Sequence, residues 1–105
     1  MKIKFLGTNG WYDTSTGNTL CTLLESDKYH VVLDAGNGFY KLDRYIGKEQ
    51  PVFLLLSHFH LDHILGLHTL VKFSFHKGLR IFGPEGLRDI LGIILNEPFS
   101  SLSKT

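Results

Sequence analysis

The sequence predicts an α/β fold, with helices layered on a mixed β-sheet. Two kinds of segment alternate along the chain. One kind is short, apolar or alternately apolar and polar, and bounded by Gly, Pro and polar residues; the other has apolar residues at helical spacing. Two early runs are separated by a turn short enough for a hairpin, so part of the sheet is expected to be antiparallel. The run after Pro51 is apolar throughout, which is typical of a strand covered on both faces.

Five segments are predicted as strands, because each is short, rich in apolar residues and followed by turn-forming residues. These segments are Lys2–Leu6, Thr19–Glu25, Tyr29–Asp34, Val52–Ser57 and Leu79–Phe82. The polar turn Ser26–Lys28 favours a hairpin between the second and third strands. The stretch Trp11–Asn18 is rich in Thr, Ser and Gly and is therefore interpreted as a loop.

Three helices are expected between and after these strands. Apolar residues at helical spacing predict a helix over Phe39–Ile46, with Gly47 as its stop. A second helix of about ten residues is predicted to end at Val71. A third is predicted over Leu87–Leu95, before the break at Pro98.

The composition is that of one globular domain without a strong preference for a charged partner. Of the 105 residues, 43% are hydrophobic and 20% charged, which is enough for one modest core and too little for two domains. Eleven basic and ten acidic residues give a net charge of +1, which argues against binding nucleic acid by charge alone. The single cysteine, Cys21, excludes an internal disulfide, and no apolar run is long enough to cross a bilayer. We therefore expect a soluble cytoplasmic protein with no membrane partner.

Four potential metal ligands lie within six residues, directly after the fourth predicted strand. His58 and His60 are two residues apart, so in extended backbone both point to one side and can bind the same ion. Asp62 and His63 fall where the chain turns into the next helix, from which they can face a second ion. Two ions about 3.5–4 Å apart could bind a phosphoryl or acyl oxygen between them. A polar surface loop without function would explain this spacing poorly.

The pattern His58-x-His60-x-Asp62-His63 resembles the signature of the metallo-β-lactamase superfamily. Further segments resemble, in order, the branch of that superfamily that holds ribonuclease Z and cyclic phosphodiesterases. These segments are Phe5–Gly10, Gly17–Thr19, Leu33–Gly36, Leu56–His58 and Gly83–Gly86. The resemblance implies an αββα sandwich with a metal site at its rim, of which residues 1–105 would form the N-terminal half.

By position, the resemblance assigns His58 and His60 to a first metal and Asp62 and His63 to a second. It makes Asp34 a supporting residue behind the site, because ligating imidazoles usually donate their other N–H to a carboxylate or a carbonyl. It also makes Asp62 a candidate for handling protons. The implied cofactors are two divalent ions, with Zn²⁺ expected and Mn²⁺ or iron also suited to these ligands.

The implied function is that of a metal-dependent hydrolase, in which a metal-bound hydroxide attacks a phosphodiester in RNA or a cyclic nucleotide. Hydrolysis of a thioester, a lactone or a β-lactam uses the same motif and remains an alternative chemistry. Trp11 and Tyr12 lie in the loop near the expected mouth of the site. They could stack on a base or cap the core, and the sequence leaves both interpretations open.

The resemblance also implies later ligands, namely another His, a bridging Asp and a final His, which have no counterpart in this sequence. His30, His68 and His76 do not obviously replace them, and we expect each to be exposed or packed rather than ligating. His30 in particular is expected near the solvent-exposed start of its strand. We therefore expect a truncated domain, with Asn96–Thr105 as a connection that leads onward and Ser100–Thr105 frayed.

Such a half domain leaves an apolar face of its sheet uncovered. A complementing C-terminal half or a second copy of the chain, forming a homodimer, would cover that face. The competing functional hypothesis is an incomplete, non-catalytic metal-binding or interaction module that needs a second half to act.

Overall fold

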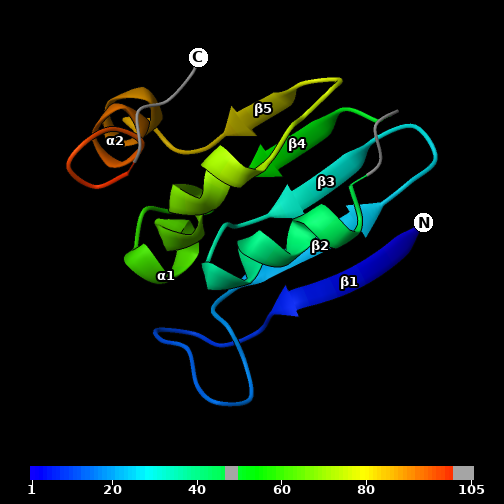
Figure 1. Cartoon of the computed structure of the whole chain (residues 1–105), viewed down its shortest axis with the longest axis horizontal. Coiled ribbons are helices and arrows are strands. Elements are labelled where there is room, and N and C mark those ends of the chain that lie inside the picture. Colours follow the sequence, from blue (N-terminus) through cyan, green and yellow to red (C-terminus); the bar gives the residue numbers. More distant parts are fainter. Residues whose placement is uncertain (47–49, 101–105) are drawn as a thin grey trace.

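The computed structural model describes residues 1–46 and 50–100, which form a mixed β-sheet with helices on one face (Figure 1). The described strands are β1 (Lys2–Gly7), β2 (Cys21–Glu25), β3 (His30–Leu33), β4 (Val52–Leu55) and β5 (Leu79–Phe82). They lie side by side in chain order. The first three strands are antiparallel to one another, whereas β3, β4 and β5 run parallel. The predicted mixed sheet is confirmed, and each predicted strand agrees with the observed one to within two residues at either end.

The predicted hairpin between β2 and β3 is confirmed. Its turn is closed by Ser26, whose backbone N–H donates to the Tyr29 carbonyl over 3.1 Å and whose hydroxyl oxygen accepts from the Tyr29 N–H over 3.1 Å. The register pairs Leu23 with Val32, and Val32 in turn pairs with Leu54 of β4. These three apolar side chains therefore stand in one row across the sheet.

The described helices are η1 (Asn37–Arg44), α1 (Leu61–Ile64), η2 (Leu65–Lys72) and α2 (Leu87–Ile94), where η denotes a 3-10 helix. The first predicted helix is present, but it is a 3-10 helix that begins two residues earlier than expected. Phe39 and Leu42 are three residues apart, so three residues per turn place both on the face that packs against the sheet, where both are fully buried. Gly47, the predicted stop, lies outside the described residues, as does the predicted tail beyond Ser100.

The helix predicted to end at Val71 is divided into α1 and η2. Gly66 explains the division, since its N–H donates to the Ala35 carbonyl over 2.9 Å rather than within a continuous α-helix. A Cβ at position 66 would overlap the carbonyl oxygen of Gly36 and lie 2.7 Å from the Cβ of Phe39. A glycine is therefore required where this helix crosses the segment after β3.

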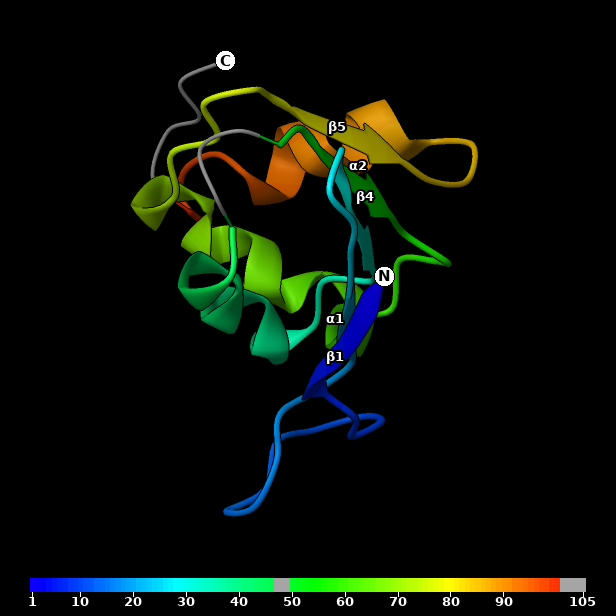
Figure 2. The same ribbon diagram turned by 90° about the vertical axis from the view of Figure 1, so that its right-hand side faces the viewer.

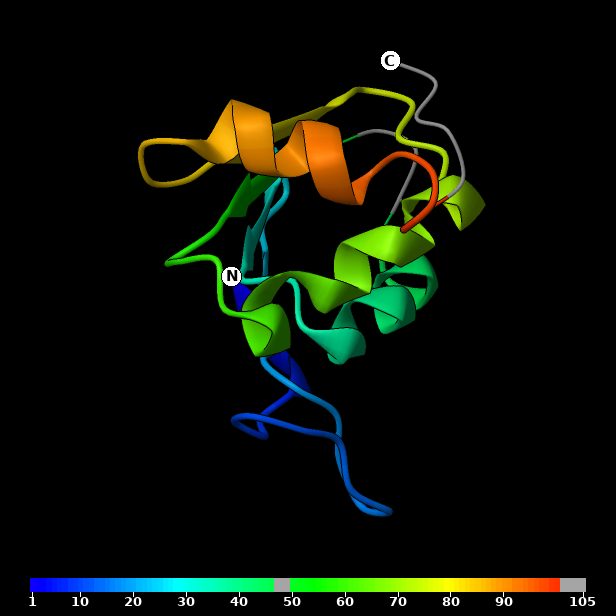
Figure 3. The same ribbon diagram turned by 90° about the vertical axis from the view of Figure 1, so that its left-hand side faces the viewer.

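The core lies between the sheet and the helices η1, α1 and η2, which Figures 2 and 3 show on one side of the sheet. The opposite face carries large apolar side chains that are exposed, namely Ile3, Phe5, Leu33, Leu55 and Phe82. Leu55 is 42% exposed although Leu54 beside it is fully buried. The prediction that this strand is covered on both faces is therefore wrong for the described chain, because the helices of that part pack on one face only.

The prediction for His30 is also wrong. His30 begins β3, but it stands two residues before Val32 and so shares the inward face, where it is only 5% exposed.

Among residues 1–46 and 50–100, no helix has both the length and the apolar character that a membrane span requires.

Candidate functional site

The four motif residues lie at the carboxyl edge of the parallel strands, with His58 and His60 in the connection between β4 and α1 and Asp62 and His63 in α1. His60 is extended, with φ −61° and ψ 143°, and its carbonyl accepts the N–H of His63 over 2.9 Å at the start of α1. Asp62 lies in the first turn of that helix. Extended backbone followed by one helical turn is the local geometry that the sequence predicts for this motif.

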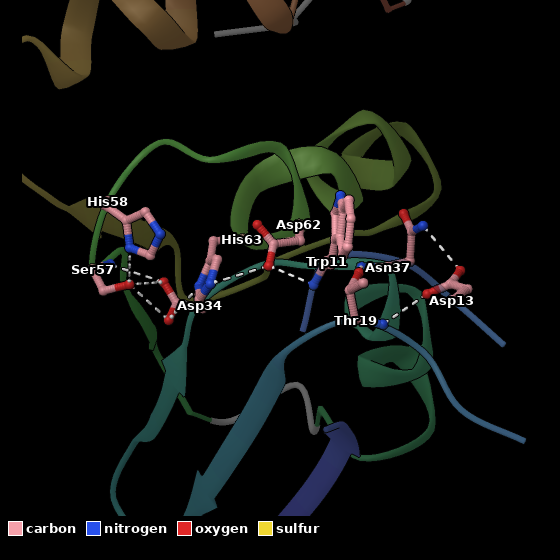
Figure 4. Close-up of polar contacts among 9 residues, drawn as sticks. All are labelled: Trp11, Asp13, Thr19, Asp34, Asn37, Ser57, His58, Asp62 and His63. Atoms are coloured by element: carbon pink, nitrogen blue, oxygen red, sulfur yellow. Dashed lines mark hydrogen bonds and ion pairs between the residues drawn. The ribbon is translucent and has the colours of Figure 1, made fainter. Parts of the chain in front are cut away.

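The three imidazole rings of the motif gather at one place. The centroid of the His58 ring is 4.5 Å from that of His60 and 4.1 Å from that of His63. His63 is largely buried, with 12% of its side chain exposed, and it lies between Asp34 and Asp62 (Figure 4). The structure thus brings together all four motif residues and Asp34.

Asp34 connects the end of β3 to the motif. Its backbone is left-handed, with φ 62°, a conformation that non-glycine residues rarely adopt outside special sites. Its Oδ1 accepts the backbone N–H of Ser57 over 2.8 Å, and the hydroxyl of Ser57 lies 3.0 Å from both carboxylate oxygens. Its Oδ2 also lies 3.0 Å from Nδ1 of His63, which is within ion-pair distance, although the ring N–H does not point along this line well enough for a hydrogen bond.

Ser57 was not identified as a site residue from the sequence, but it links Asp34 to His58. Its Oγ lies 2.9 Å from Nδ1 of His58 (Figure 4). If the hydroxyl donates to the Asp34 carboxylate, its oxygen accepts from Nδ1–H of His58. This tautomer leaves Nε2 of His58 as the nitrogen with the free lone pair.

Asp62 faces both His63 and the loop after β1. Its Oδ2 lies 3.4 Å from Nε2 of His63 and accepts the backbone N–H of Trp11 over 2.8 Å. The hydrogen bond from Trp11 is the main reason why the pKa of Asp62 lies below its usual value, with smaller contributions from the neighbouring His63 and His60. The carboxylate is therefore ionised at neutral pH and can accept a proton or bind a cation.

The side chains of the motif offer the types of donor atom that bind a divalent metal. Imidazole nitrogens and carboxylate oxygens are usual ligands of zinc and similar ions, and the carboxylate beside Nδ1 of His63 is typical of a ligating histidine. Within the described ranges, however, no three His, Cys, Asp or Glu side chains are arranged to hold one ion. The ligand roles of His58, His60, Asp62 and His63 therefore stay predictions.

The other three histidines lie outside the motif. His30 is at the opposite end of β3 from Asp34, and His68 and His76 are exposed. Burial raises the pKa of the Cys21 thiol to about 12, so this side chain is a packing residue and not a nucleophile.

An open cavity of about 670 Å³ adjoins the motif. Its walls come from the loop after β1, from the start of η1 and from α1, including Trp11, Asn37, His60 and Asp62. In Figure 4, Trp11 lies on the far side of Asp62 from His63. The cavity therefore extends from the motif toward this loop.

Comparison with known proteins defines the class to which this fold and this motif belong. The family model of the metallo-beta-lactamase superfamily matches residues 14–80, and the chain belongs to that superfamily. The predicted membership and the predicted fold are both confirmed.

Among curated relatives, the chain is similar to ribonuclease Z. It is 30% identical over 106 aligned positions to the enzyme of Clostridium acetobutylicum, covering 94% of this chain and 34% of that protein. It is 33% identical to that of Thermoplasma volcanium, covering 97% of this chain and 36% of the relative. The chain thus spans about a third of the length of the curated relatives it matches.

Two solved structures share the fold. Human tRNase Z, short form, superposes with a TM-score of 0.71 at 24% identity, covering 97% of this chain and 42% of that one. The metallo-beta-lactamase fold protein YhfI of Bacillus subtilis gives a TM-score of 0.65 at 21% identity, covering 96% and 44%.

Proposed function

We propose that this chain carries one part of a metal-dependent hydrolytic site that acts on phosphodiester bonds, with RNA as the first substrate class to test. One observation supports the proposal above the others: three imidazoles gather beside the Asp34–Ser57 pair at the edge of the sheet. Ribonuclease Z, the name of its similar relatives, denotes a nuclease, which favours a phosphodiester over a thioester, a lactone or a β-lactam.

In this proposal each side chain has a definite task. His58 and His60 supply nitrogen lone pairs to a first divalent ion, and Asp62 and His63 supply an oxygen and a nitrogen to a second. Asp34 holds His63 from behind through the 3.0 Å contact with Nδ1. Ser57 orients His58 so that Nε2 faces the site.

Divalent ions bound here would supply Lewis-acid activation of water and of the phosphodiester. Asp62 is ionised because Trp11 donates a hydrogen bond to it, so its carboxylate is available to accept a proton from an attacking water. Zn²⁺ is the first ion to test, followed by Mn²⁺ and Fe²⁺.

The experiment measures metal bound per chain and hydrolysis of a short RNA for the 105-residue protein. We expect His58→Ala and His63→Ala to lower metal content and any hydrolysis to background, because each removes a predicted ligand. His68→Ala is the matched control, since His68 is an exposed histidine of η2. Equal metal content in His58→Ala, His63→Ala and His68→Ala would contradict the proposal.

A second candidate function is an incomplete metal-binding or interaction module. It is favoured by the exposed apolar face of the sheet and by the coverage of only a third of the relatives. In this case metal binds through His58 and His63, but RNA is cleaved only when a complementing half or a second copy is present. Metal binding without hydrolysis would distinguish this function from the first.

A further inference from the structure

Trp11 and Tyr12 are the most conspicuous aromatic residues near the motif. Trp11 is 81% exposed and Tyr12 60% exposed, so neither caps the core. We propose that they form a stacking platform for a nucleobase, which would position one nucleotide of a single strand beside the histidine motif. This inference rests on the proposed function, because it names the part of the substrate that the neighbouring cavity receives.

The loop that carries the two rings is held in place by its own side chains. The amide nitrogen of Asn9 lies within hydrogen-bond distance of the Tyr12 carbonyl, of Oγ1 of Thr14 and of the Gly17 carbonyl, at 3.3, 3.2 and 3.1 Å. A loop held by this many hydrogen bonds presents its aromatic rings at a small cost in conformational entropy on binding.

The other side of the loop is fixed to the body of the protein. Asp13 accepts the backbone N–H of Thr19 over 2.7 Å and the side-chain amide of Asn37 over 3.0 Å. The hydrogen bond from Trp11 to Asp62 closes the loop against the motif. The backbone of Trp11 is left-handed, with φ 74°, so the fold holds this residue in an unfavourable conformation beside the site.

The rings and the cavity together suit a flat heterocycle joined to a phosphate. The ring centroids of Trp11 and Tyr12 are 5.3 Å apart with a 55° tilt, so they offer two differently inclined surfaces rather than a closed stack. Leu61 and Leu65 contribute apolar walls, whereas His60 and Asp62 line the cavity on the motif side. A base on the rings would therefore leave its sugar–phosphate in the cavity that His60 and Asp62 line.

Electrostatic attraction alone would not hold a single-stranded nucleic acid at this cavity. The whole chain has a net charge of only +1, and the nearby side chains Asp13 and Asp62 are acidic. Stacking on an aromatic side chain tolerates any base and contributes about 1–3 kcal/mol per base. We therefore expect single-stranded binding that depends on the bases more than on the phosphates.

The test uses a labelled oligoadenylate and an abasic strand of equal length and charge. Trp11 is the only tryptophan of the chain, so its intrinsic fluorescence reports directly on this place. We expect oligoadenylate to quench that fluorescence and the abasic strand to leave it unchanged. Binding without metal is measured, which separates this readout from hydrolysis.

Single substitutions test whether the rings of Trp11 and Tyr12 bind the base. Trp11→Ala and Tyr12→Ala are each expected to weaken binding of the labelled strand by about 5- to 150-fold, as loss of one stacked base predicts. Trp11→Phe keeps a ring and should retain most of the affinity. Tyr29→Ala is the control, since Tyr29 is an exposed tyrosine in the turn between β2 and β3.

In the binding experiment, the proposal is overturned by no binding of oligoadenylate, by equal affinity for the abasic strand, or by unchanged affinity in both alanine variants. Self-association that Trp11→Ala abolishes, without base-dependent binding, would instead make the pair an interface between copies. Hydrolysis that is normal in Trp11→Ala would contradict the platform and leave the proposed function intact. Base-dependent binding without hydrolysis by the metal-loaded chain would support the platform and favour the second candidate function, an incomplete module, over hydrolysis by this chain.

Discussion

The hydroxyl of Ser57 has two neighbours in the site, the carboxylate of Asp34 and the ring of His58. Serine has a short side chain whose hydroxyl can accept a hydrogen bond from an imidazole N–H and donate one to a carboxylate at the same time. Through it, Asp34, which follows β3, is connected to His58, which follows β4. The predicted first metal site would therefore depend on Ser57, to which no metal is assigned.

We predict that Ser57→Ala weakens metal binding by about 10- to 100-fold, the usual effect of removing a partner of a ligating histidine. His58 keeps its lone pairs in this variant but loses the group that fixes its tautomer. Competition with a chromophoric chelator gives the dissociation constant. Ser74→Ala, at an exposed serine, is the control and should bind metal like the unaltered chain. Identical affinity in the two variants would show that His58 needs no orientation by Ser57.

At the residue scale, the spacing of the motif predicts which side chains gather, and the resemblance places Asp34 behind them, but Ser57 and the contact from Trp11 were not predicted. The spacing of His58, His60 and His63 is local, so the periodicity of a strand and a helix is enough to place them. The bonds from Ser57 to Asp34 and from Trp11 to Asp62 join residues 23 and 51 positions apart. Contacts of this separation depend on how the strands are ordered, which no local pattern encodes.

At the scale of elements, the strands were predictable and the helix types were not. Each strand is bounded by turn-forming residues, and these fix its ends to within two residues. The 3-10 helix η2 begins where Gly66 passes close against Gly36 and Phe39. The helical periodicity of the sequence does not predict that contact.

The crossing at Gly66 leads to a prediction about stability. Gly66→Ala should destabilise the fold by about 3 kcal/mol or more, since the new methyl group would meet backbone that cannot move aside. Gly92→Ala is the matched control within α2, where an added Cβ meets nothing within 4 Å. That variant should gain up to about 1 kcal/mol from better helix propensity. Urea unfolding followed by circular dichroism measures both, and equal midpoints would refute the close crossing.

At the scale of the whole molecule, the sheet has one face that helices cover and one bare face, which residues 1–46 and 50–100 leave exposed. The bare face presents Phe5, Leu33, Leu55 and Phe82 to solvent, an arrangement that favours association with another apolar surface. The sequence predicted an uncovered face from the resemblance. The prediction that β4 is covered on both faces was wrong. An apolar run indicates that both faces of a strand avoid water, but it does not reveal whether the described residues themselves cover both.

We predict that the isolated 105-residue chain self-associates at micromolar concentration through this face. The double variant Phe5→Ser with Leu55→Ser should be mainly monomeric in sedimentation velocity, because it removes two large apolar side chains from the contact. Phe99→Ser serves as control, since Phe99 is equally exposed but lies beyond α2 and off the sheet. A chain that stays monomeric at all concentrations would contradict this prediction.

The order of the strands in the sheet is also the order in which they are synthesised. Each strand from β2 onward can pair with one that has already left the ribosome, so the sheet grows at a single edge without waiting for distant sequence. The contact between the Trp11 N–H and Asp62 is an exception, since it closes a span of 51 residues. The loop that borders the cavity is therefore synthesised early, whereas its partner Asp62 is synthesised only after β2, β3 and β4.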